Sequence, residues 1–171
     1  MCNIDLTNET IIHVKNKSQE YIQFKRLLKY KDVLTHCYSV GLENDFRTFK
    51  PNRTPLQMEE FVKNIENYKT LLNQINLDYT KIVKANQAHT DVIKTIIEIG
   101  DNDRIDTLEP SDGLITNKEN IVLATTNADC ILFLFFDPVK KVIANVHSGW
   151  KGTLQEISVK TLEKMQEEFR M

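Results

Sequence analysis

The sequence predicts one mixed α/β domain, built mostly of short strands with one long helix in the middle and another at the end. Three observations favour this class. Short apolar runs rich in β-branched and aromatic residues recur between turn residues. Two longer stretches instead repeat their apolar residues at three- and four-residue steps. No repeat or linker interrupts this order, so residues 1–171 are expected to form a single domain.

The first half of the chain is expected to contain three strands and the long helix. Residues 9–14 and 20–24 flank a polar turn, which is typical of a β-hairpin, and residues 33–40 are a third strand candidate. The helix should begin after Thr54 and run to about Asn76, because Thr54-Pro55-Leu56-Gln57 has the residue types of a capping box. Its predicted buried stripe consists of Phe61, Ile65, Tyr68, Leu72 and Ile75.

The second half is expected to be strands followed by a final helix. Shorter strand candidates are residues 81–85, 91–99, 114–116 and 121–126. The strongest signals are the apolar runs 131–136 and 142–146, joined by a turn at Asp137-Pro138, which predict a buried hairpin. Residues 153–169 predict the final helix, with apolar residues Leu154, Ile157, Val159, Leu162, Met165 and Phe169.

Composition narrows the classes of function. The 171 residues are 41% hydrophobic and 27% charged with a net charge of −2, as in ordinary soluble domains. This balance gives no electrostatic reason to expect nucleic acid or an anionic membrane as a partner. No apolar run is long enough to span a bilayer, and the first residues do not resemble a signal peptide, so a cytoplasmic protein is expected. Three widely spaced cysteines do not indicate a disulfide framework.

Candidate site residues stand at the ends of the central hairpin. Cys130 directly precedes its first strand and His147 directly follows its second, so pairing of the strands would make them neighbours. His89 also follows a strand candidate. Two imidazoles and one thiolate suit zinc and leave a fourth position open, as in catalytic zinc sites. The alternative is a small buried cysteine beside hydrogen-bonded structural histidines.

A second chemical interpretation uses the same atoms without a metal. Cys130 could be a nucleophile and His147 its base, with Asp129 or an amide side chain orienting the imidazole. The spacing of the residues does not separate a thiolate that binds metal from a thiolate that attacks a substrate.

The segment 147–152 raises the possibility of an anion site. Two glycines flank Trp150-Lys151 just before the final helix, where free N–H groups, the helix dipole and the Lys151 charge suit an anion. The alternative is a tight turn that needs glycine. Trp150 could stack on a flat ligand or belong to the core. Arg47, in a polar loop, could reach an anionic ligand.

Four segments of the second half together resemble the laccase-domain family, also called the polyphenol oxidase family. Its motifs QxHxxxV, (A)DALVT, TADCxPVLLxDP and HAGWRGTxxxI are matched in order by NQAHTDVI, SDGLITN, TTNADCILFLFFDP and IANVHSGWKGTLQEI. The match covers residues 81–171. Earlier, VKNIENYKTLL resembles the family's VxENYRRxx helix, whereas THCYSVGLENDFRTF departs from HGFSTRxGG and lacks the double glycine. Lys151 replaces the usual arginine and loses its planar fork.

The resemblance implies a layered αββα sandwich similar to cytotoxic-factor hydrolase domains. It also implies zinc held by the catalytic residues His89, Cys130 and His147. Members phosphorolyse adenosine, inosine, guanosine and methylthioadenosine, and they deaminate adenosine. The older oxidase label needs a multicopper cluster, which one Cys and two His cannot build, so copper is less favoured than zinc. The family pattern continues past the final helix, so the chain is expected to lack a C-terminal segment.

These implications give a specific expectation and two rivals. We expect a zinc-dependent purine nucleoside phosphorylase with adenosine deaminase activity, acting on a nucleoside and phosphate as a monomer or homodimer. Its expected substrate-binding residues are Arg47, Asp129, Trp150 and Lys151. The rivals are a metal-free Cys–His hydrolase and a truncated, inactive zinc-binding domain with an interaction or regulatory role.

Overall fold

The structure is a computed structural model that describes residues 4–16, 19–40, 45–46, 54–99 and 109–171. Its helices and strands, in chain order, are β1 (Ile11–Lys15), β2 (Glu20–Phe24), α1 (Lys25–Leu28), β3 (Tyr38–Ser39), α2 (Pro55–Gln74), the 3-10 turn η1 (Tyr79–Lys81), β4 (Ile82–Lys84), β5 (Ile93–Thr95), β6 (Gly113–Thr116), β7 (Val122–Ala124), β8 (Ile131–Asp137), β9 (Val142–Ser148), α3 (Trp150–Leu154) and α4 (Ile157–Phe169). The mixed α/β class is therefore confirmed.

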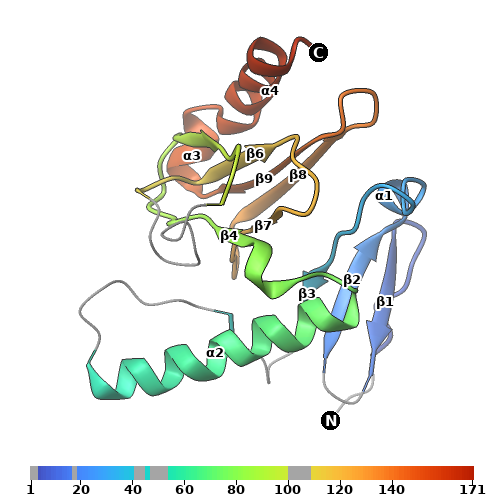
Figure 1. Cartoon of the computed structure of the whole chain (residues 1–171), viewed down its shortest axis with the longest axis vertical. Coiled ribbons are helices and arrows are strands. Elements are labelled where there is room, and N and C mark those ends of the chain that lie inside the picture. The colour runs from blue at the N-terminus through green and yellow to red at the C-terminus, as the bar shows by residue number, and fades with distance from the viewer. Residues whose placement is uncertain (1–3, 17–18, 41–44, 47–53, 100–108) are drawn as a thin grey trace.

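The described strands form three sheets. β1, β2 and β3 make an antiparallel sheet of their own, and β4 pairs in parallel with β7. The third sheet has the order β5-β6-β9-β8, in which β5 runs parallel to β6 and the other neighbours are antiparallel. In Figure 1 the last two sheets lie between α4 on one side and α2 on the other, with the first sheet beside them.

The side-chain contacts define the layers. Ile115 of β6 packs in the cluster that includes α4, whereas its neighbour Leu114 packs with Val83 of β4. Ile82, next to Val83, packs in turn in the cluster that includes α2. Because successive side chains of a strand point to opposite faces, the order is α4, the four-stranded sheet, the β4–β7 pair and α2. This is the αββα sandwich that the resemblance implied.

The central hairpin forms as its sequence predicts. β8 and β9 pair over their whole lengths, with Leu132 opposite His147 and Asp137 opposite Val142. The Asp137 carboxylate accepts the N–H of Val139 at 2.8 Å, which closes the turn. β9 lies between β6, which pairs with it as far as Val146, and β8, which pairs with it as far as Ser148.

Helix α2 also follows its sequence signals closely. The Thr54 hydroxyl accepts the N–H of Gln57, and the Gln57 side chain accepts the N–H of Thr54, which is the predicted capping box. All five predicted stripe residues pack in one cluster with Ile82 of β4: Phe61, Ile65, Tyr68, Leu72 and Ile75. The helix therefore closes one side of the sandwich.

Two predicted strands are too long. Of residues 33–40, only Tyr38–Ser39 pair as a strand. Val33 and Leu34 instead donate their N–H groups to the Tyr30 carbonyl in a turn, and the His36 Nε2 accepts the N–H of Phe24 at 2.8 Å. Of residues 91–99, only Ile93–Thr95 form β5, which pairs with the short strand β6. Beyond that pairing the chain leaves the sheet, and Ile97 is 63% exposed.

The predicted final helix is wrong as one element. It is two helices, α3 and α4, separated at Glu156, which has a left-handed φ of 57°. Only part of the predicted apolar stripe faces the core: Ile157, Met165 and Phe169 pack in the cluster with β9. The exposed apolar residues are Leu154, Val159 and Leu162.

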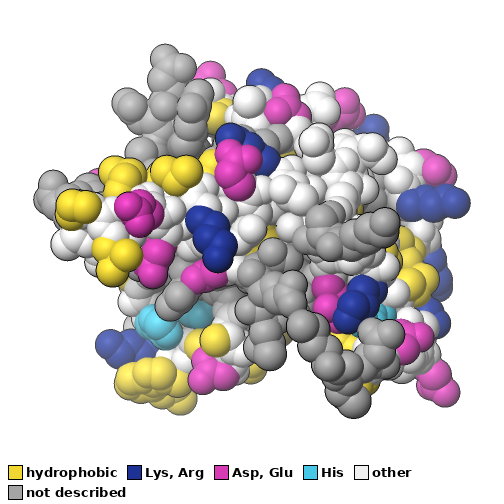
Figure 2. Space-filling view, turned by 90° about the horizontal axis from the view of Figure 1, so that it is seen from below, with side chains coloured by type: hydrophobic (Ala, Val, Ile, Leu, Met, Phe, Trp, Pro, Cys, Tyr) yellow, Lys and Arg dark blue, Asp and Glu magenta, His cyan; other side chains and the backbone are white. Residues whose placement is uncertain are grey.

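The surface agrees with the balanced composition. Figure 2 shows the face seen from the α2 side of the molecule, on which acidic and basic side chains are interspersed and histidine side chains reach the surface. Within the described ranges, no helix combines the length and the apolar character that crossing a bilayer requires.

Candidate metal centre

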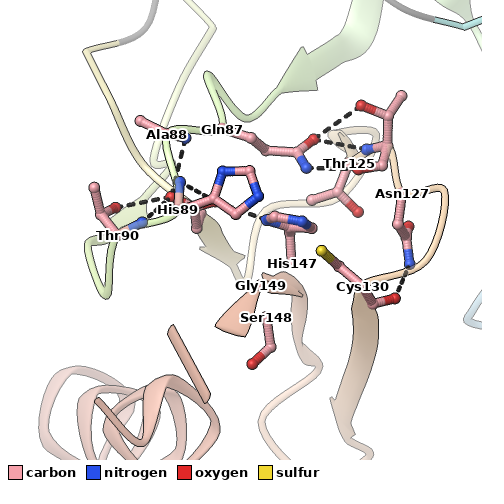
Figure 3. Close-up of polar contacts among 12 residues, drawn as sticks. Gln87, Ala88, His89, Thr90, Thr125, Asn127, Cys130, His147, Ser148 and Gly149 are labelled. Carbon is pink, nitrogen blue, oxygen red and sulfur yellow. Dashed lines mark hydrogen bonds and ion pairs between the residues drawn. The ribbon is translucent and has the colours of Figure 1, made fainter. Parts of the chain in front are cut away.

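Three side chains from different parts of the chain converge at one end of the central hairpin. The donor atoms of His89, Cys130 and His147 lie within 4.8 Å of one another. The two imidazole rings meet edge to face with centroids 5.1 Å apart, and Figure 3 shows the Cys130 thiol beside them. Donors on one tetrahedral zinc ion are roughly 3.4–3.6 Å apart, given ordinary Zn–N and Zn–S bonds. The set therefore fits zinc after a closing movement of about 1 Å.

His147 is the most firmly held of the three. It lies in β9, is buried, and its Nδ1 is 2.7 Å from Oδ1 of Asp112. Its backbone N–H also donates to the carbonyl of Asp112 at 2.7 Å. Asp112 directly precedes β6, whose pairing with β9 sets it opposite His147. An ionised carboxylate only accepts, so the imidazole donates from Nδ1 and presents Nε2 to the other two donors.

His89 is held through its backbone. It follows β4 in a loop and has a left-handed φ of 57°, which is uncommon for a residue with a side chain. The same Asp112 carboxylate accepts the N–H groups of Ala88, His89 and Thr90, at 3.2, 3.2 and 2.7 Å, and the Thr90 hydroxyl at 2.8 Å. These bonds fix the loop in the conformation that turns the His89 ring toward His147 (Figure 3).

The Asp112 carboxylate is charged at neutral pH. Burial alone would raise its pKa, but the hydrogen bonds from His147 and Thr90 outweigh burial and lower the pKa to about 2. The sequence suggests Asp129 or an amide side chain to orient the imidazole, but the group bonded to His147 is the carboxylate of Asp112. Asp129 lies instead beside Cys130, with 4.0 Å between its Oδ1 and the thiol sulfur. Asp112 stands in SDGLITN, the segment that resembles the family's (A)DALVT motif, which is the signal that the sequence offers for it.

The third donor, Cys130, is half-buried and more loosely held. Its carbonyl accepts the side-chain N–H of Asn127 at 3.0 Å. Gln87 links this loop to the loop of His89: its side chain donates to the Thr126 carbonyl at 2.5 Å and accepts the Thr126 N–H at 2.7 Å. Cys37, the other cysteine in the described ranges, is not part of the group, and burial raises its pKa to about 12.

The two glycines after His147 serve packing. A Cβ on Gly149 would lie 2.4 Å from Cδ2 of His89, and one on Gly152 would lie 3.2 Å from the Thr90 carbonyl. Gly149 has an ordinary φ of −67°, so it is the space beside His89 that requires glycine there, not a special torsion. The glycines thus let the His89 loop lie directly against the start of α3.

The predicted anion-binding residues are not brought together with the three donors. Trp150 is 67% exposed, and the Lys151 ammonium lies 5.5 Å from the centre of its ring. The helix behind them, α3, has only five residues. Neither side chain lines the cavity at the donor group, whereas Asp129 does. Arg47 lies outside the described residues.

A cavity of about 1140 Å³ opens at the three donors. It is lined by all three, and by apolar residues of β7, β8 and β9 and of α2. Its polar lining includes Thr125 and Asn145, whose side chains are joined by a hydrogen bond of 2.7 Å. Sequence reasoning gave these two residues no role. The lining mixes polar and apolar side chains, and the volume is large enough to hold a small molecule such as a nucleoside.

Comparison with known proteins gives consistent relatives. Residues 57–171 match the family model described as multi-copper polyphenol oxidoreductase laccase. The chain is 40% identical over 142 residues to a purine nucleoside phosphorylase of Clostridium acetobutylicum, covering 83% of this chain and 53% of that protein. It is 29% identical over 100 residues to an adenosine deaminase, RL5, of an unknown prokaryotic organism, covering 56% and 38%.

A solved structure is also similar to the chain. The hypothetical protein YfiH of Bacillus licheniformis aligns with a TM-score of 0.56 and 33% identity, over 63% of this chain and 41% of that one. The chain spans about half the length of the first relative above. The family match alone covers more than half of the 171 residues and includes His89, Cys130 and His147. The chain therefore belongs to the multi-copper polyphenol oxidoreductase laccase family.

Proposed function

We propose that this chain is a zinc-dependent purine nucleoside phosphorylase whose metal is held by His89, Cys130 and His147. The observation that carries the proposal is that the three donor atoms lie within 4.8 Å of one another beside a cavity, with a buried carboxylate bonded to one imidazole. Relatives named purine nucleoside phosphorylase support the reaction. Two nitrogens and one thiolate with an open position suit zinc, whereas a multicopper cluster needs more donors.

The reaction assigns roles to this chain's own groups. Phosphate would displace the purine from C1′ of the ribose, and the departing base would take up a proton. When bound, zinc would supply a Lewis acid at the open end of the donor group. Asp112 keeps the His147 Nδ1–H engaged, and the cavity around Thr125 and Asn145 would receive the nucleoside. A relative named adenosine deaminase supports a second activity, in which water replaces the amino group at C6 of adenosine.

The test is a nucleoside panel with and without phosphate. Adenosine, inosine, guanosine and methylthioadenosine are incubated with the protein, and the released bases are separated by chromatography. We expect base release only with phosphate, and its loss in His147→Ala. His13→Ala is the matched control, because His13 is bonded to Glu20 in the separate first sheet. Base release independent of phosphate, or unchanged in His147→Ala, would contradict the proposal.

The rivals predict other outcomes in the same assay. A Cys–His hydrolase would be active without metal and would lose its activity on alkylation of Cys130. A zinc-binding domain with an interaction or regulatory role would bind zinc and turn over none of the nucleosides.

We further propose Lys151 as a phosphate contact, with Arg47, Asp129 and Trp150 as other substrate contacts. Loss of one charge-assisted contact costs about 1.4 kcal/mol, so Lys151→Ala should raise the KM for phosphate about tenfold. Deamination uses no phosphate and should change much less. Equal losses in both reactions would mean that Lys151 has a structural role. Lys151 is exposed and its ammonium group lies over the Trp150 ring, so its removal should disturb the fold little.

A further inference from the structure

One buried carboxylate is hydrogen-bonded to both histidine arms of the donor group, which are the His147 ring and the loop of residues 88–90 that carries His89. Oδ1 of Asp112 lies 2.7 Å from Nδ1 of His147 and 3.2 Å from the N–H of His89. Its Oδ2 accepts the N–H and the hydroxyl of Thr90 at 2.7 and 2.8 Å, and the N–H of Ala88 at 3.2 Å. Asp112 is fully buried, so its carboxylate has no contact with solvent and its hydrogen bonds are made with these protein groups.

The N–H and O–H groups that hydrogen-bond to Asp112 determine which ring nitrogen of His147 is left to bind a metal. Backbone N–H groups surround both oxygens, so the carboxylate can act only as an acceptor there. The imidazole must then donate from Nδ1, so that its neutral form carries the lone pair on Nε2, the atom left to share a metal with His89 and Cys130. The tautomer that binds metal is therefore set without the metal.

The second arm is fixed by the same group in another way. The N–H donors of residues 88–90 all point at Asp112, which holds His89 in its left-handed conformation. The His89 ring also lies against Gly149, where a Cβ would approach it to 2.4 Å. The ring of the exposed His89 therefore has the start of α3 on one side and solvent on another.

We propose that Asp112 is the positioning residue of the metal centre, which sets the imidazole tautomer of His147 and the loop conformation of His89 together before metal binds. The inference rests on the proposed function, because it concerns the same donor set. It goes beyond that proposal by assigning two arms of the site to one residue that is not itself a ligand.

The variant Asp112→Asn keeps the shape of the side chain but changes its hydrogen bonds, so it distinguishes positioning by hydrogen bonds from a role in packing. An amide of the same shape accepts on one atom and donates from the other. If its nitrogen faces Thr90, donors oppose donors and the His89 loop is released. If its nitrogen faces His147, the imidazole must accept at Nδ1 and carry its proton on Nε2. Either orientation disables one arm, so we expect the Kd for zinc to rise about 10- to 100-fold.

Two measurements test the proposal. Long-range ¹H–¹⁵N NMR of the metal-free wild-type protein should show His147 protonated on Nδ1, and chelator competition should give the change in zinc Kd. The matched control is Asp91→Asn, which removes a carboxylate next to Thr90 that is paired with Lys160 instead. A second variant, Thr90→Val, removes one donor and should weaken zinc binding by a few-fold without changing the His147 tautomer.

The outcomes separate this inference from the proposed function. Wild-type protein that binds zinc, together with an Asp112→Asn variant that binds it equally well, would overturn the inference and leave the metal centre intact. So would a neutral His147 that carries its proton on Nε2 and none on Nδ1 in the metal-free wild type, a result that does not depend on whether any variant folds. Wild-type protein that binds no zinc would overturn the metal centre itself, whatever the tautomer.

Discussion

The two sides of the donor group are built differently. The histidine side, made of Asp112, His147 and residues 88–90, is tied together by hydrogen bonds to one fully buried carboxylate. The thiol side, residues 125–130, has a half-buried Cys130 whose sulfur has only a 4.0 Å contact with Asp129. We infer that His147 and the backbone of the His89 loop are held before a metal binds, and that the thiol and the exposed His89 ring would make the closing movement.

The largest effect should come from crowding the histidine side. Gly149→Ala would bring a methyl group within 2.4 Å of the His89 ring, so the ring must leave its position. We expect at least a tenfold rise in the zinc Kd, since the ligand is displaced, with little loss of stability because the exposed His89 side chain can turn away. Chelator competition and a thermal melt give both quantities.

Gly152→Ala is the control for this variant. Its methyl group would meet the Thr90 carbonyl at 3.2 Å and no atom of the His89 ring. If Gly149→Ala binds zinc as tightly as Gly152→Ala, the space beside the His89 ring is not what prepares the site.

Acid should lower the free energy of unfolding, because protonation of Asp112 weakens the hydrogen bonds of the histidine side. Its pKa is lowered to about 2 in the folded protein, from 3.8 ordinarily, so the unfolded chain takes up the proton first as the pH falls. The stabilisation is therefore complete above about pH 5 and is lost between about pH 4 and 2, with a total of about 2 kcal/mol. Urea unfolding of the metal-free wild type and Asp112→Asn at several pH values measures it. Parallel pH profiles for the two proteins would contradict this account.

The smallest effect is expected on the thiol side. Asn127→Ala removes the hydrogen bond to the Cys130 carbonyl, which is partly buried and worth about 1 kcal/mol. Because this side adapts, we expect the zinc Kd to rise only a few-fold. A loss as large as that of Gly149→Ala would show that the thiol side is prepared as rigidly as the histidine side.

Sequence reasoning located the donors because they stand at the ends of strongly patterned strands. The hairpin β8–β9 and helix α2 follow from apolar periodicity, a turn and a capping box, which are all local signals. They place Cys130 beside His147 without knowledge of the rest of the fold. The position of His89 came from its place after a strand and from the family motif.

What the sequence did not reveal depends on contacts between distant residues. Asp112 is bonded to residues 22–35 positions away, through the pairing of β6 with β9, and Asp129 was the nearer carboxylate in sequence. The break at Glu156 has no proline or glycine to announce it, so residues 153–169 resemble one helix. Likewise, the role of Gly149 is visible only where the His89 ring meets it.

The central claim is that Cys130 and the two histidines hold one metal ion. The direct test is elemental analysis of wild-type protein and Cys130→Ala, both isolated without chelators, alongside the phosphate-dependent release of purine base. We expect about one zinc per wild-type chain, as a three-ligand open site binds one ion, and loss of both metal and activity in Cys130→Ala while the protein remains folded. Wild-type protein that is free of metal and yet active would contradict the account.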